Sequence, residues 1–294
     1  MLFYNYELKK TMEIDKNALE KIIDLAIKED IGDGDHTSLA TIPSGLIGKA
    51  QLLVKENGII AGIGVAEIIF KKTDTQAFFK PFFSDGQFVN KGDCAFWVEG
   101  RVLKILQAER IVLNIMQRMS GIATQTHKYV EKLNGLKTRI LDTRKTSPGL
   151  RLLDKYAVKI GGGENHRFGL SDMILIKDNH IDFAGGIENA ILKTQEYLRK
   201  NNKNLKIEIE ARSLKDVKSI LENGGIDRIL LDNFTPKQTL KAVSLIKGKV
   251  EIESSGNITI KNIRNYAECG VDFISVGALT HHVKSLDLSL KASL

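Results

Sequence analysis

Charged and small residues follow six apolar segments in the second half of the chain. The residues just past these segments are Asp142-Thr-Arg144-Lys145-Thr146, Lys177-Asp178-Asn179-His180, Glu210, Asp232-Asn233, Ser255-Gly256-Asn257 and Gly277-Ala278. In an α/β barrel, catalytic side chains come from the carboxyl ends of the strands, which meet at one face. Polar ends on every segment therefore favour a shared, lined mouth over a set of unrelated solvated loops.

A first group of these side chains is cationic. It contains Arg144, Lys145 and Lys177, together with His166 and Arg167 from the glycine-rich segment between the first two strands. A guanidinium group holds a carboxylate through two parallel hydrogen bonds. The set therefore indicates a substrate that carries two negative charges.

Two further groups suit other parts of a substrate. Glu210 and Asp232 are carboxylates on separate strands, a pattern that fits a hydrated Mg²⁺ ion or ribose hydroxyls. Ser255-Gly256 and Gly277-Ala278 follow the last two strands, where barrels often bind a phosphate with backbone N–H groups. Together with the cations, these groups predict a phosphorylated sugar that meets an acidic partner.

Glu208 and Glu210 leave an alternative at the carboxylate position. They are two residues apart in one expected strand, so both side chains point to the same face. Only the residue nearer the carboxyl end reaches the mouth easily, which favours Glu210.

The elements that must position these residues alternate regularly. β-like runs occur at 138–142, 173–176, 206–210, 228–232, 250–253 and 272–276, with helical patterns at 185–199, 213–223, 235–246 and 259–268. Such alternation predicts a parallel sheet covered by helices. A complete eight-stranded barrel needs roughly 200 residues or more. About 160 are available here, so we expect an incomplete barrel of six or seven strands.

The first half of the chain has a mixed pattern. Asp15 can cap a helix that Gly32 ends, and short β-like runs follow at 49–55, 77–83 and 94–98. A long helical pattern then extends from about Val102 to Met119. This half is therefore expected to be α+β.

Composition excludes several broad classes. The chain has 294 residues, of which 43% are apolar and 27% charged, so global disorder is excluded. The longest apolar stretch, 58–70, is too short for a membrane span, which needs about 18 residues. The first ten residues lack a signal-peptide pattern, and two cysteines are too few for a disulfide scaffold. We therefore expect a cytoplasmic protein.

Several strings of the sequence resemble quinolinate phosphoribosyltransferases, also called carboxylating nicotinate-nucleotide pyrophosphorylases. They are EDIGDGDHTS (29–38), ERIVLNIMQRMSGIAT (109–124), LDTRKTSPGLRLLDKYAVKIGGGENHRFGLSDMILIKDNH (141–180), ILLDN (229–233), ESSGNI (253–258) and DFISVGALTH (272–281). The resemblance extends from about residue 15 to the end, and the string at 141–180 is highly specific. It implies transfer of a phosphoribosyl group from phosphoribosyl pyrophosphate to quinolinate, with release of pyrophosphate and CO₂.

The resemblance also implies an architecture. An N-terminal open-faced α/β sandwich, residues 1–120, would precede an incomplete α/β barrel, residues 121–281, and the tail 282–294 would pack back on the first domain. The family further implies a homodimer in which the N-terminal domain of one subunit completes the site of the other.

The resemblance implies a role for each site residue. Arg144, His166, Arg167 and Lys177 would hold the quinolinate carboxylates, and Arg110 would reach the neighbouring subunit's site. Phosphoribosyl pyrophosphate would be bound by Lys145, Asp178, Glu210, Asp232, Ser255, Gly256, Gly277 and His281. Lys145, Glu210 and Asp232 would serve catalysis, and the last two would organise Mg²⁺ through water or substrate. Asn257 stands where the family usually has a second glycine.

Two other functions compete with this assignment. A related phosphoribosyltransferase with another acceptor, such as nicotinate, would need fewer cations than Arg110, Arg144, His166, Arg167 and Lys177 provide. A basic nucleic-acid-binding barrel would fit the net charge of +7. That function needs clustered cations with interleaved aromatics, and aromatics are only 6% of this chain.

Overall fold

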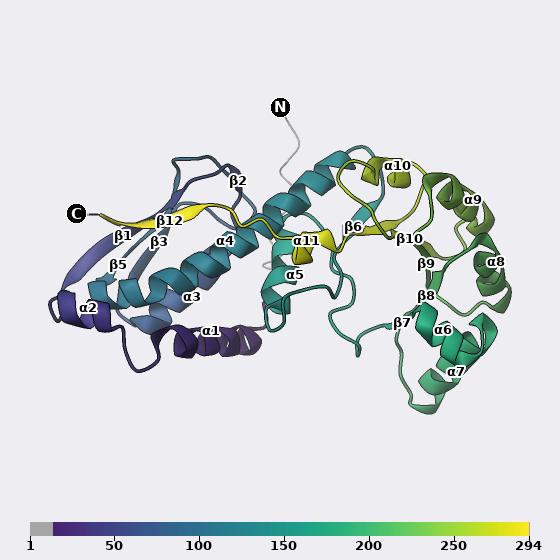
Figure 1. Ribbon diagram of the computed structural model, residues 1–294, viewed down its shortest axis with the longest axis horizontal. Coiled ribbons are helices and arrows are strands. Elements are labelled where there is room, and N and C mark those ends of the chain that lie inside the picture. The colour runs from purple at the N-terminus through teal and green to yellow at the C-terminus, as the bar shows by residue number, and fades with distance from the viewer. Residues whose placement is uncertain (1–13, 294) are drawn as a thin grey trace.

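The computed structural model describes residues 14–293. The first half of the chain contains an antiparallel sheet of strand order β12-β1-β5-β3. Its strands are β1 (Ile47–Val54), β3 (Phe78–Pro81), β5 (Cys94–Arg101) and β12 (Leu288–Ser293). The end of the chain therefore returns to the first sheet, where Leu290 of β12 lies opposite Leu52 of β1. Figure 1 shows β12 beside the purple and blue strands of the N-terminal half.

Helices cover one face of this sheet. They are α1 (Lys16–Ile31), α3 (Ile63–Thr73) and α4 (Val102–Lys132), and α1 packs against α4. The expected cap is present, because the Asp15 side chain accepts a hydrogen bond from the Ala18 N–H at 3.1 Å. Gly32 ends the helix at a positive φ of 56°. The short elements α2 (His36–Thr41), β2 (Gly58–Ile59) and β4 (Phe88–Val89) complete this half.

The helix expected to end near Met119 continues to Lys132 and is 31 residues long. It passes residue 120 without a break and extends from the first sheet to the second (Figure 1). Gly121 is a poor helix former, but packing requires it, because a Cβ there would lie 2.2 Å from the Lys284 carbonyl oxygen. The glycine thus lets the returning chain cross α4 closely.

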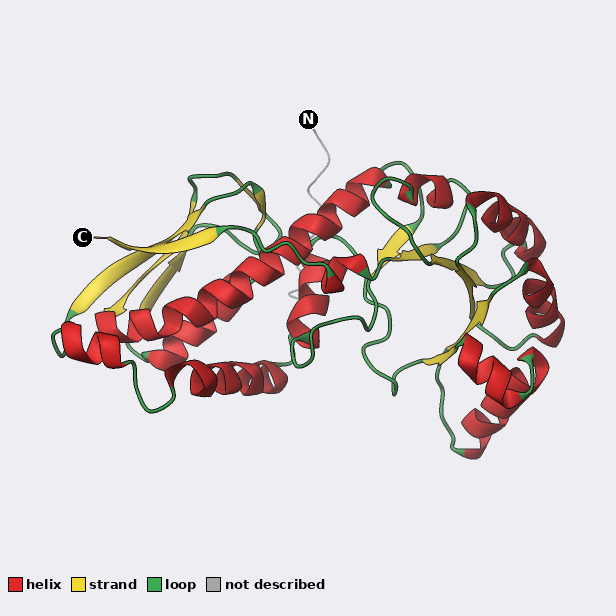
Figure 2. Cartoon of the chain, viewed as in Figure 1, coloured by secondary structure: helices red, strands yellow, loops and turns green. Residues whose placement is uncertain are grey.

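The second half forms six parallel strands in the order β6-β11-β10-β9-β8-β7. They are β6 (Arg139–Leu141), β7 (Ile174–Ile176), β8 (Ile207–Ala211), β9 (Arg228–Asp232), β10 (Glu251–Ser255) and β11 (Phe273–Ser275). The strands curve into an arc with helices outside it, and the arc is not closed (Figure 2). The prediction of an incomplete barrel is confirmed, with six strands.

The helices of this half are α5 (Arg151–Ile160), α6 (Asp178–Ala184), α7 (Ile187–Lys200), α8 (Leu214–Asn223), α9 (Pro236–Ile246), α10 (Ile263–Ala267) and α11 (Ala278–His281). Four of them, α7 to α10, lie within or close to the ranges expected for them, whereas α5, α6 and α11 were not predicted. In the described part of the chain, no helix combines the length and apolar character that a membrane crossing requires.

Strand register gives the barrel a charged interior. Arg228 lies opposite both Glu208 and Glu251, while Leu230 lies opposite both Glu210 and Glu253. Side chains alternate between the two faces of a strand, so these residues project to one face in successive layers. The interior of the arc therefore contains ion pairs, those of Arg228 with Glu251 and Glu253, whereas the opposite face carries apolar residues such as Ile209 and Ile229 against the helices.

Candidate active site

A cavity of about 300 Å³ opens at the carboxyl ends of the parallel strands. Its lining contains cations, acids and small polar residues. These are Thr143, Arg144, Lys145, His166, Arg167, Leu175, Lys177, Glu210, Leu230, Glu253, Ser255 and Ser275. The structure thus brings all five cations of the predicted barrel set into one cavity, together with Glu210 and Ser255.

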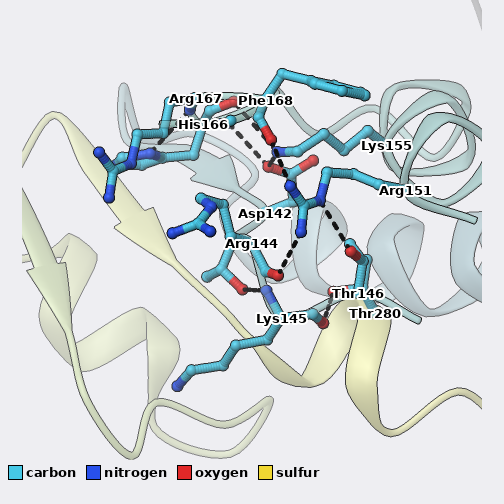
Figure 3. A network of polar contacts seen from close by, with 12 residues as sticks. Asp142, Arg144, Lys145, Thr146, Arg151, Lys155, His166, Arg167, Phe168 and Thr280 are labelled. Carbon is cyan, nitrogen blue, oxygen red and sulfur yellow. Dashed lines mark hydrogen bonds and ion pairs between the residues drawn. The ribbon is translucent and has the colours of Figure 1, made fainter. Parts of the chain in front are cut away.

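Arg144 and Lys145 lie on the loop after β6, and both side chains are exposed. The loop is held by its backbone. The Lys145 carbonyl accepts a hydrogen bond from the Thr280 hydroxyl at 2.8 Å, and the Lys145 N–H donates to the Thr143 hydroxyl at 3.1 Å. Figure 3 shows both side chains extending away from these contacts. The charged ends are therefore free to meet a substrate while their backbone is fixed.

His166 lies at the floor of the cavity between two buried glutamates. Its Nε2 is 2.9 Å from Glu208 Oε2 and 3.3 Å from Glu253 Oε2. Burial lowers the pKa of His166, but the two carboxylates outweigh burial and raise it to about 9. The Arg167 N–H points at Nδ1 from 2.9 Å, which opposes protonation there, but one backbone dipole is weaker than two carboxylate charges. His166 is therefore held by the protein on both ring nitrogens.

Glu208 and Glu253 share this buried cluster with Arg228. Burial raises the pKa of Glu208 to about 7, and repulsion from Glu253 adds to that rise. Arg228 donates to Glu253 Oε2 at 3.0 Å and to Glu251 Oε2 at 3.0 Å. The ligand atoms of His166, Glu208 and Glu253 lie within 4.8 Å of one another. Within it, His166 Nε2 lies at ion-pair distance from both carboxylates, so the cluster supports the cavity floor.

A second buried pair connects the two loops that carry the cations. Asp142, at the end of β6, and Lys155, in α5, form an ion pair with no solvent exposure of the carboxylate. Asp142 also accepts the His166 N–H at 2.9 Å, and Lys155 donates to the His166 carbonyl at 3.2 Å. Burial raises the pKa of Asp142 to about 6 and lowers that of Lys155, while each partner opposes the shift of the other. The pair thus clamps the backbone of His166 (Figure 3).

Glu210 lies at the mouth and Glu208 one layer deeper. Glu210 Oε1 is 3.3 Å from Lys177 Nζ, and Glu210 Oε2 accepts the Asp178 N–H at 3.1 Å. Glu208 is fully buried against His166. Of the two glutamates, only Glu210 lines the cavity, as its position nearer the end of the strand predicts.

The loops after β9 and β10 are joined through asparagines. Asn233 donates from Nδ2 to Asp232 Oδ2 at 2.9 Å, and Asn257 donates to Asn233 Oδ1 at 3.2 Å. Asn257 has a φ of 51°, a left-handed conformation that asparagine adopts more easily than most residues. It can therefore occupy the position where the family usually has glycine. Gly256 has a φ of 94°, and a Cβ there would lie 2.2 Å from Asn233 Oδ1.

The remaining predicted residues lie around the cavity or outside it. Gly277 separates His281 from Lys145, because a Cβ on it would lie 3.1 Å from atoms of each. Burial lowers the pKa of His281, and the neighbouring His282 and Lys145 add to this effect. Asp232, Asp178 and Gly256 stand at strand ends without lining the cavity. Arg110 is exposed on α4 and also lies outside the lining.

Several residues that shape the site were missed from the sequence. They are Arg118, Arg151, Asp154, Lys155, Arg228, Glu253 and Ser275. One signal was available, since the strings KIEIE and VEIE place glutamates at alternating positions of otherwise apolar strands. In a parallel sheet covered by helices, such alternation indicates a charged interior.

Comparison with known proteins finds the same family along the chain. The quinolinate phosphoribosyl transferase C-terminal domain matches residues 122–291, and the N-terminal domain of that family matches residues 35–120. The chloroplastic carboxylating nicotinate-nucleotide pyrophosphorylase of rice (Oryza sativa) is 49% identical, over 93% of this chain and 77% of its own length. The chloroplastic Arabidopsis thaliana protein is 47% identical over 93% of this chain and 82% of its own. The structure of the Francisella tularensis nicotinate-nucleotide pyrophosphorylase superposes with a TM-score of 0.89 at 39% identity, covering 96% of this chain and 98% of that chain.

These relatives overturn one expectation. The rice and Arabidopsis proteins are both chloroplastic, so the prediction of a cytoplasmic protein is wrong. It depended on the first ten residues, which lie outside the described residues, and on the small number of cysteines. Neither feature carries information about a particular organelle.

Proposed function

This chain belongs to the quinolinate phosphoribosyl transferase family, and from that premise we propose how its residues carry out the reaction. The enzyme transfers the phosphoribosyl group of phosphoribosyl pyrophosphate to quinolinate, forming nicotinate mononucleotide, pyrophosphate and CO₂ for NAD biosynthesis. The observation that carries the assignment of residues is the single cavity in which four Arg and Lys side chains stand beside Glu210 and Ser255.

The cations form the acceptor end of the site. Arg144, Arg167 and Lys177 line the cavity and bind the two carboxylates of quinolinate. Arg167 is the most constrained of them, because its NH1 donates to the Met173 carbonyl at 3.1 Å and leaves the rest of the fork for substrate. His166 has both ring nitrogens occupied by the protein, so its contribution to binding is to hold the Arg167 backbone.

The acidic residues and the last two loops form the sugar end. Glu210 and Asp232 bind the ribose hydroxyls, and Lys145 neutralises the pyrophosphate. Ser255, Gly256 and Gly277, with His281 beside them, hold the 5′-phosphate. Their positions after the carboxyl ends of β10 and β11 support this, since backbone N–H groups of such loops commonly bind phosphate.

Asp232 has a carboxylate oxygen more available for Mg²⁺ than Glu210 does. Both oxygens of Glu210 already accept from Lys177 and Asp178, whereas Asp232 uses Oδ2 toward Asn233. We therefore place Asp232 as the carboxylate that would hold Mg²⁺, with Glu210 acting through water or substrate. When bound, the ion would supply neutralisation of the charge that develops on departing pyrophosphate.

Ribosylation precedes decarboxylation in this proposal. Displacement at the anomeric carbon passes through an oxocarbenium-like state, by analogy with other glycosyl transfers, which Glu210 and Asp232 stabilise electrostatically. Only the ribosylated pyridine nitrogen is quaternary, so only then can the ring accept the electron pair of the breaking C2–CO₂ bond. The cations hold both carboxylates until that step.

We also infer a homodimer with a shared site. Arg110 is exposed and stands outside the cavity of its own chain, which supports a role toward the cavity of a second copy. Apolar side chains around it on the same half of the molecule, including Leu46, Ile47 and Leu106, are exposed. An apolar surface with a cation at its edge suits an interface between subunits.

The experiment that tests the reaction measures CO₂ and pyrophosphate release by purified protein with Mg²⁺. Both products should appear only when quinolinate and phosphoribosyl pyrophosphate are present together. CO₂ release from quinolinate without the sugar would overturn the order of steps. Turnover of nicotinate at a rate comparable with quinolinate would instead favour the one-carboxylate acceptor.

A further inference from the structure

Arg151 joins the two loops that carry the substrate-binding cations. It lies in the first turn of α5, and its Nε donates to the Thr146 hydroxyl at 3.1 Å. Its NH1 donates to the Phe168 carbonyl at 3.1 Å, and its NH2 makes a longer contact of 3.5 Å with the Arg144 carbonyl. One guanidinium thus bonds to the loop after β6 and to the loop before β7 (Figure 3).

The position of Arg151 argues against direct contact with substrate. The cavity lining contains Arg144 and Arg167 but not Arg151, which is half-buried behind the loops. The guanidinium has three of its donors directed at protein oxygens, and its planar fork is rigid. It is therefore built to fix the separation of two backbone segments.

The segments that it joins have few other direct connections. Asp142 and Lys155 hold the backbone at His166, which precedes Arg167, while Asp172 accepts the Phe168 N–H at 2.6 Å within the second loop. Arg151 alone among these residues bonds both to residues 144–146 and to residue 168. We propose that Arg151 is a positioning residue that sets the spacing of Arg144 and Arg167, and thereby the preference of the site for an acceptor with two adjacent carboxylates.

The consequence follows from geometry. Two vicinal carboxylates on a rigid ring require two cationic groups at one separation, whereas a single carboxylate can follow either group as it moves. Misplacement of binding groups by about 1 Å can lower the rate about 100-fold. The inference rests on the proposed role of Arg144 and Arg167 in binding the dicarboxylate.

The test compares Arg151→Ala with wild type in dicarboxylate and monocarboxylate binding. The probes are quinolinate turnover and the binding of benzene-1,2-dicarboxylate and pyridine-2-carboxylate by calorimetry. We expect the quinolinate KM to rise and benzene-1,2-dicarboxylate binding to weaken, each by roughly 10- to 100-fold. Pyridine-2-carboxylate binding and the KM for phosphoribosyl pyrophosphate should change by less than about threefold, and guanidinium ions added to the solution should partly restore quinolinate turnover.

Arg264→Ala is the matched control. Arg264 also donates to two backbone carbonyls, those of Lys132 and Asn134, and to Glu268, but it lies on α10 away from the cavity. The Arg264→Ala variant should leave the binding of every ligand unchanged. If Arg151→Ala does not fold, Thr146→Val removes the hydroxyl that accepts the Arg151 Nε–H. This variant should weaken dicarboxylate binding less than Arg151→Ala, and it should likewise leave monocarboxylate binding nearly unchanged.

Three results would overturn the proposal. The first is unchanged dicarboxylate binding in a folded Arg151→Ala protein. The second is an equal loss of affinity for benzene-1,2-dicarboxylate and pyridine-2-carboxylate. The third is a loss of phosphoribosyl pyrophosphate binding as large as the loss of dicarboxylate binding. Arg167→Lys distinguishes a failure of the Arg151 proposal from a failure of the proposed acceptor site. If Arg167→Lys also leaves quinolinate binding intact, the assignment of the acceptor end is at fault rather than the role of Arg151.

Discussion

At the scale of single residues, the cavity has exposed cations at its opening and deeper cations that protein acceptors hold. Arg144, Lys145 and Lys177 are exposed at strand ends, while His166 and Arg167 lie deeper. Each deep cation is held by protein acceptors, the Met173 carbonyl for Arg167 and the two glutamates for His166. A conservative substitution of a deep cation should therefore disturb its contacts with the protein as well as the substrate site, whereas one of the exposed Arg144 or Lys145 should not.

Arg167→Lys tests the acceptor end. Lysine keeps the charge but loses the planar fork, so it can serve either Met173 or a substrate carboxylate, not both in one plane. We expect the quinolinate KM to rise roughly 10- to 100-fold, with little change in the KM for phosphoribosyl pyrophosphate. Steady-state kinetics with each substrate varied in turn measures this, and unchanged quinolinate kinetics would remove Arg167 from the site.

His166 makes stability depend on pH. Its pKa is raised in the folded protein to about 9 from an ordinary value of 6.5. The stabilisation is therefore fully present below pH 6.5 and is lost as pH rises through 9. The raised pKa of Glu208 also makes the free energy of unfolding fall as pH rises, here between 4.5 and about 7, because ionisation of this buried carboxyl is unfavourable. The free energy of unfolding should fall by on the order of 2 kcal/mol between pH 6.5 and 9.

Urea unfolding at several pH values measures this dependence. His166→Gln should flatten the curve over that range. His127→Gln is the control, since His127 is half-buried on α4, outside the cluster, and is 3.6 Å from Glu131. An unaltered pH dependence in His166→Gln would show that the cluster is not its source.

At the scale of elements, the loops after the strands depend on close backbone approaches. Gly256 combines a positive φ with contact to Asn233, and Asn233 in turn contacts Asp232 and Asn257. A side chain at residue 256 would therefore displace both loops, the one after β9 and the one after β10, which form the proposed sugar end. At the proposed acceptor end, helix α5 holds the loops through the side chains of Arg151, Asp154 and Lys155. Asp154 accepts Arg118 of α4 in a two-bond contact at 2.8 Å for each bond.

Gly256→Ala should weaken phosphoribosyl pyrophosphate binding by roughly tenfold or more, because Asn233 and the backbone must shift. Gly135→Ala is a matched control, since Gly135 also has a positive φ, 86°, but nothing lies within 4 Å of an added Cβ. Backbone strain at a positive φ should cost each variant about 1 kcal/mol of stability, and the overlap with Asn233 should add to the loss in Gly256→Ala. Only Gly256→Ala should raise the KM for the sugar substrate, and an equal effect of the two variants would exclude a specific role for this loop.

At the scale of the whole molecule, α4 and β12 connect the two halves of the chain. α4 begins beside the first sheet and ends beside the arc of parallel strands, and the C-terminal strand returns to β1. Arg118 in the middle of α4 donates to the Thr280 carbonyl at 3.1 Å, so the same helix also contacts α11, beside the proposed phosphate site. Arg110 lies two turns earlier on this helix, facing solvent.

Subunit mixing tests the shared site. Arg110→Ala and Lys177→Ala should each be nearly inactive alone, because each removes a cation from every site. A heterodimer of the two variants regains one intact site out of two, so random exchange should restore about a quarter of wild-type activity. Mixing Lys177→Ala with Arg167→Ala is the control, since both residues line the cavity of the same chain and no intact site forms. Absence of recovery in verified heterodimers of the first pair would contradict the shared site.

The sequence by itself determined the features that depend on local pattern. Strand–helix alternation predicted the six parallel strands, and polar residues after each strand predicted the cavity, because carboxyl ends of parallel strands necessarily lie at one face. Strand polarity likewise predicted Glu210 rather than Glu208 at the mouth. The Asp15 cap and the Gly32 end of α1 required only the adjacent residues.

Only the tertiary structure decided which groups support these residues. Lys155 lies 13 residues from Asp142, Glu253 lies 87 from His166, and Thr280 lies 135 from Lys145, so no local pattern relates them. The continuation of α4 past Met119 has the same origin, since the crossing of residues 284–286 favours glycine within a helix that local propensity would end. Buried ions and close backbone contacts gain their energy from desolvation and packing, which exist only once distant segments have come together.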